Sequence, residues 1–155
     1  DRFNETDSPA GFFAEDAHLF DTTLRDNLLV ARGDATDDEL TAALAQVGLA
    51  PWLATLPDGL STLLSGGAAA VSAGQRRRLL LARALLTDFP VVLLDEPTEH
   101  LDAADSHRLL AELLTPGAMF GADRAVVVAT HHLPPDLPCT VLNLDSSNDG
   151  YPAQS

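Results

Sequence analysis

Two adjacent carboxylates, Asp95 and Glu96, directly follow the apolar run 91–94. A short run of this kind, coming after a proline, is typical of a strand buried on both faces of a parallel sheet. Ligands bind at the carboxyl ends of such strands. An aspartate there can hold Mg²⁺ through water, and a neighbouring glutamate can polarise a water for attack on a γ-phosphate. A solvated acidic turn after a core strand is the alternative interpretation.

A second group of candidate residues, Ser72, Ala73, Gly74 and Gln75, begins an arginine-rich helix predicted over about 72–86. A helix N-terminus offers unpaired N–H groups and the positive end of its dipole. The Ser72 hydroxyl can donate a hydrogen bond, and Gly74 lets a phosphate approach the backbone closely. The pattern indicates an anion site. An ordinary serine N-cap on a surface helix is the alternative.

A histidine pair, His131 and His132, follows the apolar run 125–129 shortly after its end. We predict a second buried strand there, which places His131 at the same sheet edge as Asp95 and Glu96. A histidine in that position can hydrogen-bond a γ-phosphate and the attacking water. A polar residue at the strand exit is the alternative. A histidine pair can also suggest a metal site, but no third ligand lies at a suitable spacing.

Strands and helices alternate along the chain, which predicts an α/β layered domain. A capping box, Thr36 with Glu39, starts one helix, and Gly48 ends it. Residues 57–71 are predicted to form a loop. The predicted strands are 11–14, 91–94, 125–129 and 140–144, and the predicted helices are 23–31, 36–47, a short one around Trp52 and Leu53, 72–86 and 103–114.

Composition narrows the class of protein further. The chain has 155 residues, of which 46% are apolar, so one folded domain is expected. A net charge of −14 argues against a general nucleic-acid binder. The single cysteine, Cys139, excludes a disulfide within the chain. No stretch is long and apolar enough for a membrane span, so any membrane part lies elsewhere.

In this order and at these spacings, the motifs closely resemble those of the ABC ATPase family. Residues 72–75 match its signature motif, and 91–96 match Walker B with the catalytic glutamate. Residues 98–102 match the D-loop, and His131 matches the switch histidine. Upstream, 15–28 resembles the Q-loop region of exporter-type members.

The resemblance covers residues 11–144 and implies a partial P-loop NTPase-like domain, a parallel sheet core with a helical signature subdomain. It divides the whole chain, 1–155, into a Q-loop region (11–30), a helical subdomain with the signature (31–89), a part with Walker B, D-loop and switch histidine (90–144) and a tail (145–155).

The resemblance also implies the cofactors and partners. ATP and Mg²⁺ would bind, a second ABC ATPase domain would complete each ATP site in a homo- or heterodimer, and a transmembrane domain would couple hydrolysis to transport at the cytoplasmic face of a bacterial inner membrane. No nucleic acid is expected. The implied roles are catalysis for Glu96 and His131, Mg²⁺ binding for Asp95 and Glu15, ATP contacts for Ser72, Ala73, Gly74 and Gln75, and a bridge between the two domains for Asp102.

Three departures from the family pattern bear on activity. Glu15 stands where the Q-loop has glutamine, and Ala73 replaces the first glycine of the signature. All nine basic residues are arginine, so the chain contains no Walker A lysine. The isolated chain is therefore expected to be inactive.

Residues 64–68 look superficially like a signature but lack its glutamine and following helix, and we interpret them as a loop turn.

Within the family, segments 14–18 and 96–102 and the His131–His132 pair look like those of half-transporters that export cysteine or glutathione and support cytochrome bd assembly.

Two other functions stay open. One is a non-hydrolysing partner that only donates its signature, favoured by Glu15 and Ala73. The other is a DNA-repair ABC ATPase, disfavoured by the negative charge and the lack of a coiled coil; salt-dependent DNA binding would distinguish it.

Overall fold

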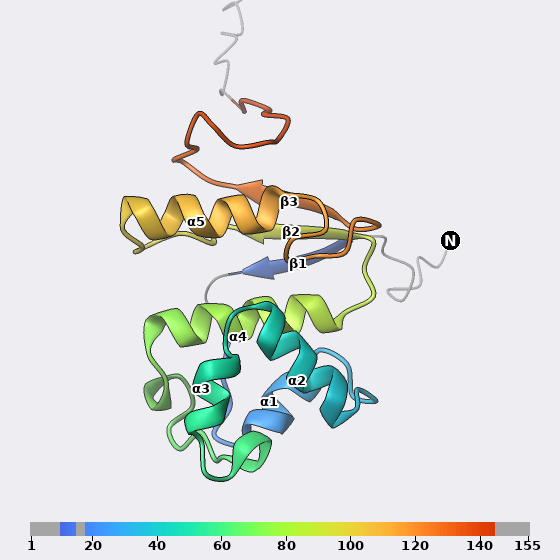
Figure 1. Cartoon of the computed structure of the whole chain (residues 1–155), viewed down its shortest axis with the longest axis vertical. Coiled ribbons are helices and arrows are strands. Elements are labelled where there is room, and N and C mark those ends of the chain that lie inside the picture. Colours follow the sequence, from blue (N-terminus) through green and yellow to red (C-terminus); the bar gives the residue numbers. More distant parts are fainter. Residues whose placement is uncertain (1–9, 15–17, 145–155) are drawn as a thin grey trace, which may run out of the picture.

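A three-stranded parallel sheet forms one layer of the structure (Figure 1). The computed structural model describes residues 10–14 and 18–144. The strands are β1 (Ala10–Ala14), β2 (Val91–Asp95) and β3 (Ala125–Ala129), side by side in that order. Because all three run the same way, their carboxyl ends meet at one edge.

The helices between β1 and β2 form a second layer, in which α4 lies between the sheet and the other three (Figure 1). The fifth helix connects β2 to β3. No helix in the described part of the chain has the length and apolar character needed to cross a bilayer. The bounds are α1 Leu24–Leu29, α2 Asp37–Gln46, α3 Ala50–Thr55, α4 Ala73–Leu86 and α5 Ala103–Leu114, with single turns of 3₁₀ helix, η2 and η3, at Gly59–Ser61 and Gly67–Ala70.

Reciprocal capping boxes begin α2 and α4. The amide of Glu39 donates to the Thr36 hydroxyl at 3.3 Å, and the Thr36 amide donates to the Glu39 carboxylate at 2.8 Å. Ser72 and Gln75 repeat this pattern at 3.1 Å and 2.9 Å. Each box satisfies backbone donors that a helix start leaves unpaired. Both predicted helix starts are confirmed.

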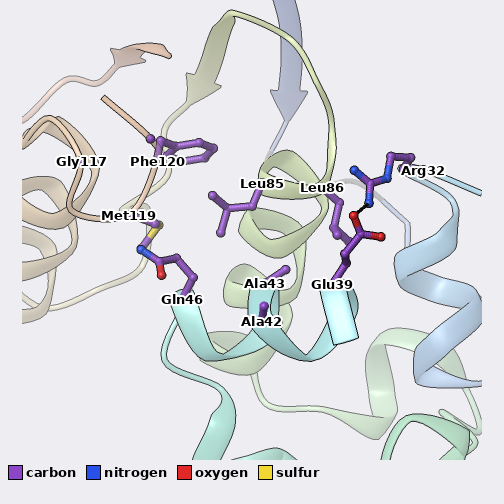
Figure 2. A pocket seen from close by; sticks show the side chains of 11 residues that line it. Arg32, Glu39, Ala42, Ala43, Gln46, Leu85, Leu86, Gly117, Met119 and Phe120 are labelled. Atoms are coloured by element: carbon purple, nitrogen blue, oxygen red, sulfur yellow. Dashed lines mark ion pairs between the residues drawn. The ribbon is translucent and has the colours of Figure 1, made fainter. Parts of the chain in front are cut away.

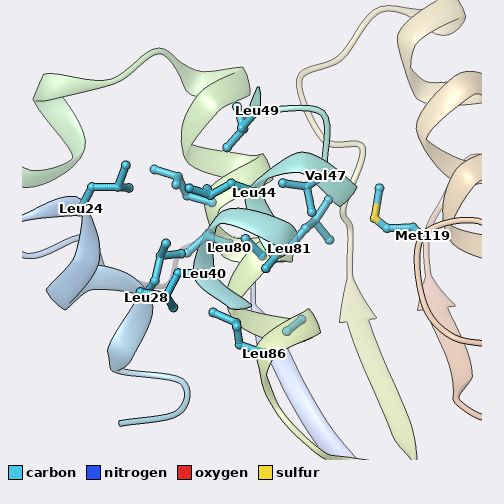
Figure 3. Packing of buried hydrophobic residues seen from close by; sticks show 14 of the residues in the cluster. Leu24, Leu28, Leu40, Leu44, Val47, Leu49, Leu80, Leu81, Leu86 and Met119 are labelled. Atoms are coloured by element: carbon cyan, nitrogen blue, oxygen red, sulfur yellow. The ribbon is translucent and has the colours of Figure 1, made fainter. Parts of the chain in front are cut away.

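The main core lies where α2 packs on α4 (Figure 3). Apolar residues recur along α2 at helical spacing, so one face is buried against α4. Each fully buried leucine contributes about 2 kcal/mol from removal of apolar surface from water. The buried set includes Leu40, Ala43, Leu44 and Val47 from α2 and its C-cap, and Leu79, Leu80, Leu81, Ala82, Ala84 and Leu86 from α4.

The two faces of the sheet differ in burial, which corrects the prediction of strands buried on both faces. Val92 and Leu94 of β2 join the core, together with Leu109 and Leu113 of α5. The opposite face carries a row of three residues in register, namely Phe12, Leu93 and Val127, which we call the apolar row. Phe12 is 64% exposed, Val127 is 50% exposed and Leu93 is half-buried. No described helix covers that row, so strand β3 is half-exposed rather than buried.

Residues 140–144 form no strand, and this prediction is wrong. Val141, Leu142 and Leu144 are exposed instead. Alternating apolar residues form a strand only where a neighbouring strand accepts their backbone hydrogen bonds. The predicted loop turn at 64–68 is confirmed, because Gly66 adopts φ 84° and helix η3 follows it.

At acid pH, we expect the start of α2 to lose part of its contribution to stability. Hydrogen bonds from the Thr36 amide and from Arg32 lower the pKa of Glu39 below its ordinary value of 4.5. Hydrogen bonds from Arg25 likewise lower the pKa of Asp37. A carboxylate whose pKa is lowered by folding stabilises the fold above its unfolded pKa. That contribution is lost as pH falls through the folded pKa.

Urea unfolding from about pH 7 to about pH 3 tests this expectation. Glu39→Gln keeps an oxygen for the cap but cannot titrate, so its stability should fall less steeply than that of the parent below pH 4.5. Asp58→Asn is the control, since the Asp58 side chain makes no cap hydrogen bond. Equal slopes for the parent and Glu39→Gln would contradict the prediction.

Candidate functional site

The carboxyl edge of the sheet brings together Asp95, Glu96 and His131. Asp95 ends β2 and is exposed, and Glu96 follows it. The His131 amide donates to Glu96 Oε1 at 3.1 Å, and its ring Nε2 lies 3.3 Å from the same oxygen. The Glu96 side chain is 25% exposed, whereas that of His131 is 90% exposed. The carboxylate is thus held from one side and accessible from the other.

The backbone of Glu96 is also unusual. Its φ is 45°, a left-handed value that costs conformational energy in a residue with a side chain. The Glu96 amide donates to the Ala129 carbonyl at 2.8 Å, which fixes it against the end of β3. Glu96 therefore leaves the strand in a direction set by the sheet.

The N-terminus of α4 lies near the same edge, because Arg77 in its second turn and Asp95 line one small cavity. Ala73 and Gly74 are exposed, and a methyl group added at Gly74 would meet open space. The Ser72 hydroxyl accepts the Gln75 amide but still has its own hydrogen to donate. The arrangement can accept an anion from solvent.

Two predicted site residues remain, Asp102 and Glu15. Asp102 is the N-cap of α5, since its Oδ1 accepts the Asp105 amide at 2.8 Å. Its carboxylate is exposed at the helix start, and a bridge to a second domain stays a prediction. Glu15 lies outside the described residues. Within 10–14 and 18–144, no three His, Cys, Asp or Glu side chains gather in a metal-binding cluster.

A groove of about 390 Å³ lies away from this edge (Figure 2). It runs between α2, the C-terminal end of α4 and residues 117–121. An ion pair of 2.5 Å between Arg32 and Glu39 closes one side. The groove adjoins Leu85 and Leu86, at the opposite end of α4 from Ser72, so it is no part of the candidate site.

Two buried arginines of α4 were not identified as site residues from the sequence. Arg77 donates to the Glu99 carbonyl in the loop after β2. Arg83 donates to the carbonyls of Asn27 and His18, both at 2.7 Å, and burial lowers the pKa of its guanidinium. Arg83 falls on the apolar side of the predicted helix, and a charged residue in that phase is the signal for a buried polar contact.

The fold and the edge define a class of protein. The sheet is parallel and packed with helices, and its central strand ends at Asp95 with Glu96 directly after it and His131 beside Glu96. This is the arrangement of a P-loop NTPase-like α/β domain. The chain belongs to the ABC transporter family, whose sequence profile matches residues 2–99. The predicted family and fold class are thereby confirmed.

Curated relatives are larger proteins that combine ATP-binding and permease parts. The glutathione/L-cysteine transport system ATP-binding/permease protein CydC of Escherichia coli (strain K12) is 47% identical over 116 residues, which are 75% of this chain and 19% of the relative. The mycobactin import ATP-binding/permease protein IrtB of Mycolicibacterium thermoresistibile is 47% identical over 88 residues, 57% of this chain and 15% of the relative. The chain thus spans about a fifth or less of their length.

A solved structure supports the same fold. A bacterial Atm1-family ABC exporter with ATP bound superposes with a TM-score of 0.62 at 26% identity. The match covers 80% of this chain and 21% of the exporter chain.

Proposed function

We propose that the chain is the C-terminal part of the ATP-hydrolysing domain of an ABC exporter. The observation that carries this proposal is the Glu96 carboxylate, held by His131 next to Asp95 at the carboxyl edge of the sheet. A general base must be fixed in orientation and accessible to the water that it activates. The geometry of Glu96 meets both requirements.

In the proposed mechanism, Glu96 polarises the water that attacks the γ-phosphate of ATP. His131 keeps the carboxylate oriented through its amide, and its exposed ring hydrogen-bonds the γ-phosphate. Because phosphoryl transfer needs little covalent chemistry from the protein, such positioning and charge stabilisation supply most of the catalysis.

Asp95 fits the role of a Mg²⁺ ligand. A carboxylate oxygen is the donor that Mg²⁺ prefers, and one or two carboxylates with waters and phosphate oxygens complete its usual shell. Asp95 is exposed at the strand end and offers such an oxygen. Bound Mg²⁺ would neutralise charge on the phosphates. Glu15, the second proposed ligand, lies outside the described residues.

The start of α4 would serve a second ATPase domain. Ser72, Ala73 and Gly74 contact the γ-phosphate of the ATP bound to that partner, and Gln75 holds the serine through the capping box. Asp102 lies close to the partner domain. Closure of the two domains on ATP drives a transmembrane domain at the cytoplasmic face of a bacterial inner membrane.

Cysteine or glutathione is the proposed cargo, exported in support of cytochrome bd assembly. The CydC relative is named for glutathione and L-cysteine transport, which supports this cargo, as do the subgroup features at 96–102. IrtB, which is 47% identical over a shorter stretch, is named for mycobactin import, so a transport assay with both compounds distinguishes the two cargoes.

A signature-donor partner without hydrolysis is the second candidate function. The methyl group of Ala73, where the family has glycine, favours it because it reduces the room for a phosphate. The orientation of Glu96 by His131 favours hydrolysis instead.

Phosphate release and transport by the complete membrane protein test the proposal. We expect Mg²⁺-dependent ATP hydrolysis, with uptake of labelled cysteine or glutathione into inside-out vesicles and no uptake of a mycobactin. The 155-residue chain alone should not hydrolyse ATP, because it has no lysine to hold the phosphates. ATP binding without hydrolysis by the complete protein would favour the signature donor.

A further inference from the structure

The Arg77 side chain connects the start of α4 to the loop that follows β2. It is only 9% exposed, and its Nη2 donates to the main-chain carbonyl of Glu99. A hydrogen bond from a charged guanidinium is stronger than one between neutral groups. Helix α4, whose N-cap is Ser72, is therefore connected by a hydrogen bond to loop 96–102.

The loop that Arg77 contacts is held in an unfavourable backbone conformation. Glu96 has φ 45° and His100 has φ 65°, and in the described part of the chain no other residue but glycine has a positive φ. Such residues persist only where the surrounding contacts hold them. The Glu99 carbonyl lies between these two positions, so its hydrogen bond helps to hold both.

Backbone hydrogen bonds within the loop are few. The Glu99 amide donates to the Glu96 carbonyl at 3.1 Å, and the Leu101 amide donates to the Thr98 carbonyl at 3.1 Å. These bonds define two tight turns but do not fix them relative to α4. Arg77 supplies a contact that crosses from the helix to the loop.

Arg77 also lies against the end of β2. With Asp95 and Pro97, it lines a small cavity of about 30 Å³. The other lining residues are apolar side chains of β1, β2 and α4. One side chain thus adjoins the elements that carry the anion-binding helix start and the catalytic edge.

We infer that Arg77 is a positioning residue that makes the orientation of Glu96 depend on the position of the α4 N-terminus. A phosphate that binds at Ser72–Gly74 displaces the start of α4. Arg77 transmits this displacement to the Glu99 carbonyl and so to the loop that begins at Glu96. The inference rests on the proposed function, because Glu96 needs an orientation only if the domain hydrolyses ATP.

Substitutions in the complete protein test the inference. Arg77→Gln removes the charge and shortens the side chain, so kcat should fall between about tenfold and a hundredfold, as expected for a misplaced catalytic group. KM for ATP should change by less than about twofold, since the contact serves the transition state. Arg77→Lys keeps the charge but not the planar fork and should recover part of kcat.

Arg78→Gln is the matched control, one residue further along α4. Arg78 donates to the Val47 carbonyl at 2.7 Å and lies 3.8 Å from Glu112, so it contacts other elements than loop 96–102. Its kcat should stay within about twofold of the parent. The melting temperature of each variant shows whether a lost rate reflects lost folding.

The outcomes separate the inference from the function on which it rests. Equal kcat values for Arg77→Gln and Arg78→Gln overturn the inference. If Arg77→Gln fails to fold, Arg77→Lys decides: reduced kcat at a normal melting temperature supports positioning, and unchanged kcat overturns it. Normal hydrolysis by Glu96→Gln instead refutes the catalytic assignment itself, whatever Arg77 does.

Discussion

Replacing Glu96 by glutamine in the complete protein is expected to slow ATP hydrolysis by about a hundredfold or more while ATP still binds. Glutamine is nearly the same size, and its carbonyl oxygen can still accept the His131 amide that now bonds Glu96 at 3.1 Å. A carboxamide cannot take a proton from water, so only the chemical step is affected. The signature-donor function predicts no change in a hydrolysis rate contributed by the partner's own site.

Single-turnover phosphate release and equilibrium binding of labelled ATP separate the two effects. Glu112→Gln is the control, because Glu112 lies on α5 in an ion pair of 3.8 Å with Arg78, away from the catalytic edge. Its rate should equal that of the parent. A Glu96→Gln protein with a normal rate, or one that no longer binds ATP, would contradict the assignment.

Replacing Arg83 by methionine should lower the free energy of unfolding by about 3 kcal/mol, the largest stability effect that we expect. The guanidinium donates to the His18 carbonyl, the Asn27 carbonyl and Asn27 Oδ1, at 2.7, 2.7 and 3.1 Å. Asn27 itself is 1% exposed. Methionine fills much of the space but removes the donor of the buried Asn27 carbonyl and of the His18 carbonyl, whereas Asn27 Oδ1 keeps the Phe20 amide at 2.8 Å.

Urea unfolding followed by the fluorescence of Trp52, the only tryptophan, measures the effect. The midpoint should fall by about 1 M or more. Arg108→Met is the matched control, because Arg108 is 66% exposed and pairs with Asp105 on the same helix, a contact worth less than about 0.5 kcal/mol. Similar midpoints for the two variants would show that the buried network contributes little.

Sequence reasoning succeeded where the determinants are local. Thr36 with Glu39 is a capping box, as predicted, because the pair lies three residues apart and needs no distant partner. The helix start at Ser72 was predicted too, but its capping box with Gln75 was not. The strand that ends at Asp95 was predicted for a similar reason, since a short apolar run followed by charged residues and proline limits the choices.

The failures concern neighbours that a local pattern cannot contain. Residues 140–144 have the composition of a strand, but no strand in the described part of the chain pairs with them. Val127 resembles a core residue in sequence and is nevertheless half-exposed, because no described element covers its face of the sheet. Burial on both faces depends on what packs there, which the strand sequence does not encode.

The candidate site was predicted in part. The motif order placed Glu96 and His131 at one edge, and the structure brings them within hydrogen-bonding distance. The contact of Arg77 with Glu99 spans 22 positions in sequence, and three consecutive arginines gave no indication of which would turn inward.

The apolar row on the uncovered face of the sheet has a consequence for the colloidal behaviour of the isolated chain. A net charge of −14 keeps chains apart at long range, whereas Phe12, Leu93 and Val127 attract at contact. Salt shortens the range of the repulsion and leaves the attraction in place. Light scattering should therefore rise with ionic strength and fall on dilution into low salt, and Val127→Thr should reduce the rise. An acidic chain would then lose solubility as salt is added.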